Sequence, residues 1–121
     1  MQAIIGFASI LILLMPVAGA REQSVYKTKP ACPEYDVACY IEMTAKRAGI
    51  DPNVAHDIAF CESGLDPYAR NPQSTASGVY QFLEGTWGAY CEGNVFNYED
   101  NVDCFMQLFP KNPTWWVCYG S

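Results

Sequence analysis

The chain has 121 residues, a formal net charge of −6 at pH 7 and six cysteines. Its length suits one domain of ordinary size, which we expect to be monomeric. The acidic balance and the lack of a Lys and Arg cluster argue against a nucleic-acid partner, because phosphate binding requires clustered positive charge.

The N-terminal segment 1–20 contains no charged side chain. Its apolar run from Ile4 to Met15 is followed by Pro16 and by the small residues Ala18-Gly19-Ala20. Because this run is too short to cross a bilayer comfortably, we interpret residues 1–20 as a signal peptide that is removed on export. An uncleaved membrane anchor is the alternative, since no Lys or Arg follows Met1. Residues 21–32 are then a flexible leader and residues 33–121 the domain, in a secreted or periplasmic, cell-wall-associated protein.

All six cysteines lie after the predicted signal peptide, at Cys32, Cys39, Cys61, Cys91, Cys104 and Cys118. An even number of cysteines in a small exported chain predicts disulfides. Structural zinc is disfavoured, because the chain lacks close cysteine pairs and His56 is its only histidine. We expect no metal and no cofactor. The spacing alone leaves many disulfide connectivities open.

Two helices are predicted in the first half of the domain. Between Pro33 and Ala48, apolar residues recur at helical spacing and Gly49 follows as a C-cap. Asp51 and Pro52 then form an N-cap and first-turn pair, and the apolar positions that follow predict a second helix ending near Gly64.

The second half of the domain reads as an irregular segment followed by shorter helices. Residues 65–78 are rich in Gly, Pro, Asn, Asp and Ser, which predicts an irregular crossing, with a short hairpin, that lines a cleft. Helices are predicted from about Leu83 to Tyr90 and from Tyr98 to Phe109, before an aromatic tail. The fold class expected is α+β, mainly α.

Glu62 is the main candidate for catalysis. It follows Ile58 by four positions and Ala59 by three, so it projects from the apolar side of its helix. Partial desolvation there raises the pKa of a carboxyl, as a general acid near neutral pH requires. The alternative is a helix-end glutamate turned to solvent. We assign no role to His56.

Several motifs occur in order around this residue. Cys61-Glu62-Ser63-Gly64 closes the helix, Ala76-Ser77-Gly78-Val79-Tyr80-Gln81-Phe82 and Thr86-Trp87 follow, and Trp115-Trp116-Val117-Cys118 lies near the end. Together they resemble the lysozyme-like superfamily of lytic transglycosylase (SLT) domains and goose-type lysozymes. Within it the pattern most closely resembles the resuscitation-promoting factors. The stretch between Gly64 and Gly78 also resembles the soluble lytic transglycosylases.

The resemblance implies a small lysozyme-like domain that cleaves peptidoglycan glycan strands at the MurNAc–GlcNAc β-1,4 bond. It implies Glu62 as acid/base, a bridge between Cys61 and Cys118, and glycan contacts by Ser63, Tyr80, Gln81, Trp87 and Trp115. Tyr80 departs from the leucine common in the resuscitation-promoting factors. The other four cysteines are additions to the pattern of that family. Their proximity in the sequence suggests that Cys32 pairs with Cys39 and Cys91 with Cys104.

Which mechanism applies depends on whether a second carboxylate exists, because ordinary glycosidases use two. Asp66 reads as a turn residue before Pro67, and Glu84 as a charge at a helix start. We therefore predict a transglycosylase, in which Glu62 serves both steps. The alternatives are a lysozyme-type hydrolase and a glycan-binding module without turnover.

Overall fold

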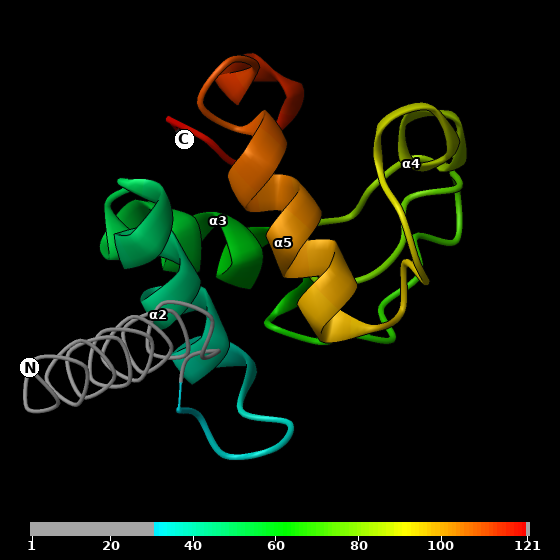
Figure 1. Ribbon diagram of the computed structural model, residues 1–121. Helices are drawn as coiled ribbons and strands as arrows, with labels where there is room; N and C mark the ends of the chain where they lie inside the picture. Colours follow the sequence, from blue (N-terminus) through cyan, green and yellow to red (C-terminus); the bar gives the residue numbers. More distant parts are fainter. Residues whose placement is uncertain (1–30, 121) are drawn as a thin grey trace, which may run out of the picture.

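The computed structural model describes residues 31–120 and is mainly helical there, as expected. Helices α2 (Val37–Ala48), α3 (Pro52–Ser63) and α5 (Tyr98–Leu108) form the body, with α2 packed against both others. Helix α4 (Glu84–Tyr90) lies on the opposite side of α5 from α2 and α3 (Figure 1). A short 3₁₀ helix, η1 (Pro113–Trp115), precedes the end of the chain. The predicted signal peptide and most of the predicted leader lie outside the described residues.

Helix α2 begins four residues later than the sequence suggested. Pro33 to Asp36 form a turn, in which the N–H of Asp36 donates to the carbonyl of Pro33. The helix is then capped by Asp36, whose Oδ1 accepts a 2.9 Å hydrogen bond from the N–H of Cys39. Pro33 resembles a first-turn proline, but a side-chain cap decides where the helix starts.

Helix α3 has the predicted boundaries. Asp51 accepts a hydrogen bond from the N–H of Asn53, and Pro52 occupies the first turn, where its missing N–H costs nothing. The helix ends at Gly64, which adopts the left-handed conformation with φ of 67°. Because both ends are fixed, Glu62 is held in the last turn of the helix.

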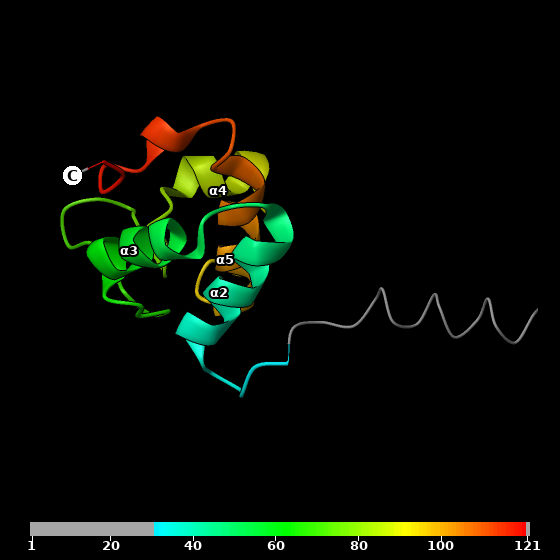
Figure 2. The same ribbon diagram turned by 90° about the vertical axis from the view of Figure 1, so that its left-hand side faces the viewer.

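The segment between α3 and α4 is irregular, as predicted. Its β pairing within the described residues consists of isolated bridges from Ser77 to Arg70 and to Phe82. Helices α4 and α5 match their predicted ranges to within one residue. Figure 2 shows α2 and α5 side by side with α3 beside them.

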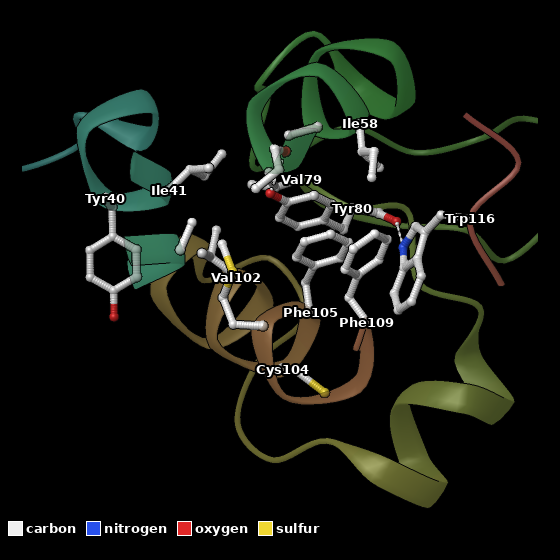
Figure 3. Packing of buried hydrophobic residues seen from close by; sticks show 14 of the residues in the cluster. Tyr40, Ile41, Ile58, Val79, Tyr80, Val102, Cys104, Phe105, Phe109 and Trp116 are labelled. Carbon is white, nitrogen blue, oxygen red and sulfur yellow. Dashed lines mark hydrogen bonds between the residues drawn. The ribbon is translucent and has the colours of Figure 1, made fainter. Parts of the chain in front are cut away.

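The core lies among α2, α3, α5 and the 79–82 segment, and aromatic rings fill its centre (Figure 3). Tyr80 stacks in parallel on Phe105 with ring centroids 3.6 Å apart. Trp116 meets Phe105 edge to face at 4.9 Å. The C-terminal segment is therefore part of the core.

Three disulfides close the domain: Cys32–Cys39, Cys61–Cys118 and Cys91–Cys104. These are the pairs expected from the sequence. The second joins α3 to the C-terminal segment across 57 positions, and by the chain-entropy model such a loop contributes about 4 kcal/mol. The three bridges indicate an oxidising, extracytoplasmic compartment. In the part of the chain that the structure describes, no helix has the length and apolarity needed to cross a bilayer.

Candidate active site

Glu62 lies in the last turn of α3, where its side chain is partly buried. Burial raises the pKa of its carboxyl above the ordinary value, because desolvation disfavours the charged form. A hydrogen bond from the backbone N–H of Cys118 acts in the opposite direction, with a smaller effect. The group is therefore biased toward the protonated state, which can donate a proton.

The residues on either side of Glu62 are anchored to other segments. Cys61 is bonded to Cys118. The Ser63 hydroxyl donates a 2.7 Å hydrogen bond to the carbonyl of Val79. It also accepts a hydrogen bond from the N–H of Asp66. The end of α3, the 76–82 segment and the C-terminal segment therefore converge around Glu62.

These contacts give Ser63 a structural position. We expected this residue to contact the glycan, but its hydroxyl is engaged with the backbone of the chain itself. It ties the end of α3 to the 76–82 segment.

At Gly78, the backbone of the 76–82 segment lies close to Val95 and Asn101. Its φ is 80°, and a Cβ there would collide with the side chain of Asn101 and the carbonyl of Val95. The fully buried Asn101 accepts a 2.9 Å hydrogen bond from the N–H of Tyr80 and donates one to the carbonyl of Val95. A long-range polar contact thus sets the path of the segment.

The expectation that Tyr80 faces the glycan is wrong. Its side chain is 0% exposed, and its hydroxyl donates a 2.7 Å hydrogen bond to the carbonyl of Ala55. The carbonyl of Tyr80 accepts from the indole N–H of Trp116 at 3.0 Å. The ring is a packing element beneath the site, because its polar end is satisfied inside the protein.

Gln81, in the same segment, is partly buried and has a φ of 53°. Its side-chain nitrogen donates to the carbonyls of Gly78 and Ala69, at 2.9 and 3.2 Å. These two bonds fix the orientation of the amide. Gln81 also lines a hollow of about 300 Å³, which we call the tryptophan hollow; its other lining residues are Phe82, Leu83, Thr86, Trp115 and Trp116.

The tryptophans differ in accessibility. Trp115 is 46% exposed, and its ring lies 5.5 Å from that of the exposed Tyr90. Trp116 is buried in the core. Trp87 is partly buried, meets Phe82 edge to face and donates its indole N–H to Gly93. Among the aromatic residues expected to contact the glycan, Tyr80, Trp87 and Trp115, Trp115 is the most exposed.

No glycan contact was predicted from the sequence for Leu83 or Thr86, which also line the tryptophan hollow. Leu83 is 50% exposed, and Thr86 is three positions further along the chain, on the same side of α4. The three-residue spacing is the signal that would have placed both on one face of the hollow.

The two other candidate carboxylates have local roles in the structure. Asp66 accepts a 2.8 Å hydrogen bond from the N–H of Tyr68, which is the turn geometry predicted for it. Glu84 lies in the first turn of α4 and lines a separate groove of about 530 Å³ with Arg70 and Trp87. Within residues 31–120, no group of three or more His, Cys, Asp or Glu side chains is arranged to hold a metal ion.

Comparison with known proteins identifies the family to which the chain belongs. Residues 39–111, more than half of the chain, match the family model described as Transglycosylase SLT domain. The chain belongs to the transglycosylase SLT domain family. Proteins with SLT domains are typically lytic transglycosylases that act on peptidoglycan. The part matched to the SLT domain contains Glu62 and Gln81, whereas Trp115 and Cys118 lie beyond it. Searches of curated proteins and of solved structures find no significant match.

Proposed function

We propose that this protein cleaves the MurNAc–GlcNAc β-1,4 bond of peptidoglycan as a lytic transglycosylase, with Glu62 as general acid and base. The observation that carries the proposal is the environment of Glu62 in an SLT domain. Its partly buried carboxyl has a raised pKa at the end of a helix that is capped at both ends and cross-linked. Such a group donates a proton near neutral pH more readily than a solvated glutamate.

In the first step, protonated Glu62 donates its proton to the glycosidic oxygen, which leaves as the 4-hydroxyl of GlcNAc. The bond from this oxygen to C1 of MurNAc breaks, and the carbonyl oxygen of the MurNAc 2-acetamido group shares its electrons with C1. This participation supplies the stabilisation for which other glycosidases use a second carboxylate.

In the second step, the Glu62 carboxylate removes the proton from the 6-hydroxyl of the same MurNAc. The 6-oxygen bonds to C1 and the acetamido oxygen is released, which forms the 1,6-anhydro ring. Glu62 ends protonated, so no water is consumed and one residue serves both steps.

The positions of Asp66 and Glu84 support this one-carboxylate mechanism. Asp66 accepts a hydrogen bond from the N–H of Tyr68 in a turn, and Glu84 lies in the first turn of α4, so each has a local structural role. A lysozyme-type hydrolase would require one of these groups, or another carboxylate, to activate water or act as nucleophile.

The decisive experiment is digestion of purified peptidoglycan in heavy-oxygen water, followed by mass spectrometry of the soluble products. We expect unlabelled muramic ends that are one water lighter than the reducing sugar. A labelled reducing end would contradict the transglycosylase mechanism and indicate a hydrolase. Intact glycan, with binding retained, would indicate a module that binds without turnover.

We also propose that the mature protein is exported as a monomer after cleavage behind Ala20. The three disulfides support export, since they require an oxidising compartment.

A further inference from the structure

A second hollow lies where the start of the domain meets the N-terminal end of α5. It has a volume of about 370 Å³. Its lining includes the residues Glu34, Tyr35, Tyr68, Asn94, Asn97 and Tyr98, and we call it the tyrosine groove. None of the residues that line it lines the tryptophan hollow.

Two of the tyrosines are unusually open to solvent. Tyr35 is 70% exposed and Tyr68 is 67% exposed. Tyrosine side chains this exposed contribute little to the core, and exposed aromatic rings are typical of surfaces that bind ligands. Tyr98 is partly buried and forms the inner part of the groove, with its ring 6.3 Å from that of Tyr35.

The backbone holds Tyr35 in a costly conformation. Its φ is 63°, in the left-handed region that bulky residues rarely adopt. The turn is fixed by the neighbouring Cys32–Cys39 bridge, and the N–H of Tyr35 donates to the hydroxyl of Tyr98 at 3.3 Å. Residues in such conformations cluster at functional sites, because the surrounding structure must compensate for the strain. The strain keeps an exposed ring at the groove.

Polar groups in the groove suit hydroxyl and acetamido groups. The side-chain oxygens of Asn94 and Asn97 accept hydrogen bonds from the N–H groups of Phe96 and Asp100. This leaves the NH₂ group of each asparagine as a donor. The carboxylates of Glu34 and Glu99 also line the groove, and its lining residues include no Lys or Arg. An uncharged ligand therefore fits better than a phosphate or a polyanion.

Flat aromatic faces combined with amide donors and a carboxylate are the chemistry that binds sugar rings. The apolar face of a pyranose packs on an aromatic ring while its hydroxyl groups bond to the polar side chains. We propose that the tyrosine groove is a second saccharide-binding site, which holds an uncharged N-acetylhexosamine segment away from Glu62. The ligand class rests on the proposed function.

The loop from 65 to 70 connects this groove to the candidate active site. It leaves α3 just after Glu62, presents Tyr68 to the groove, and accepts the side-chain hydrogen bond of Gln81 at the carbonyl of Ala69. The two sites therefore share one loop. A glycan strand bound at Tyr68 would therefore lie next to Ala69, whose carbonyl accepts the hydrogen bond from Gln81.

The test uses the tetramer of N-acetylglucosamine, added to the Glu62→Gln variant so that no turnover occurs. Binding is followed by NMR through the backbone amide signals. We expect shifts at residues 34–35, 68 and 94–98, and we expect Tyr35→Ala and Tyr68→Ala each to weaken binding there about fivefold. Maltotetraose, which lacks acetamido groups, should bind more weakly.

Two matched controls distinguish the loss of an aromatic ring in the groove from a general effect of the substitution on the fold. Tyr35→Phe keeps the aromatic face at the same backbone conformation and should retain most of the binding. Phe60→Ala removes another exposed ring, on α3 and outside the groove, and should have no effect. Shifts confined to the region of Gln81 and Trp115, or unchanged binding in both alanine variants, would overturn the proposal.

The same data distinguish the two proposals. Anhydro products from the wild-type protein without shifts in the groove would leave the proposed function standing and remove the second site. Suppose instead that the protein releases no product from peptidoglycan but shows groove shifts that Tyr35→Ala abolishes. This result would overturn the proposed function and leave the second site standing.

Discussion

Trp115 and Trp116 are adjacent in the chain but belong to two different regions of the molecule. Trp116 joins Tyr80 and Phe105 in a buried support, where Tyr80 stacks on Phe105 and Trp116 meets Phe105 edge to face. Trp115 belongs to an exposed rim with Leu83 and Tyr90, which are 50% and 55% exposed. One region holds the candidate site in shape, and the other offers surface to a ligand.

Hydrogen-bonding partners distinguish the two regions better than motif position does. In the support, the hydroxyl of Tyr80 and the indole N–H of Trp116 donate to backbone carbonyls within the protein. Their polar atoms are satisfied and their faces are covered, so no surface remains for a sugar. In the rim, Trp115 and Tyr90 contact each other and still expose about half of their surface.

The largest expected effect comes from removing a ring of the support. Trp116→Ala should lower the free energy of unfolding by about 3–5 kcal/mol, because it opens a cavity against Phe105 and leaves the carbonyl of Tyr80 without its donor. Trp115→Ala should change stability by no more than about 1 kcal/mol, and should instead slow peptidoglycan cleavage. Urea unfolding of both variants measures the difference. Equal destabilisation would mean that the two regions are not distinct.

The next largest effect is a loss of cleavage without a loss of stability. Glu62→Gln should leave the fold intact and reduce cleavage at least about 100-fold, because an amide of nearly the same shape has no acidic proton to donate. The rate of release of soluble muropeptides measures this loss.

Matched controls for that variant are Asp66→Asn, Glu84→Gln and Glu92→Gln, which remove other carboxylates. Each should retain measurable turnover. Activity of Glu62→Gln within a few-fold of the wild type would exclude Glu62 as the acid, and a loss of orders of magnitude in a control would indicate a two-carboxylate hydrolase.

Local signals in the sequence predicted the helices well. Asp51, Pro52 and Gly64 specify both ends of α3 through caps that act within a few residues. The start of α2 was misplaced because two capping signals compete there, and the side chain of Asp36 decides between them. Local chemistry therefore fixes the position of Glu62 on its helix.

The assignment of the aromatic residues depended on contacts that the sequence does not show. Tyr80 is buried because Phe105, Ala55 and Trp116, all more than twenty positions away, enclose its ring, its hydroxyl and its carbonyl. Its motif position suggested a glycan contact, but the motif does not tell which way the side chain points. The exposed ring of Tyr35 was not predicted from the sequence, because no motif includes this residue.

The smallest expected effect concerns the contribution of Glu62 to the pH dependence of stability. Burial raises the pKa of Glu62 in the folded protein, so the native state binds a proton more tightly than the unfolded chain. The resulting stabilisation is complete below the ordinary pKa of a glutamate and is lost as the pH rises through the folded-state value. Glu62→Gln does not titrate, so its stability relative to the wild type should increase from acidic to neutral pH. Paired urea unfolding curves across that range measure the change. A difference that stays constant, or that falls toward neutral pH, would mean that the Glu62 carboxyl is not desolvated in the folded protein.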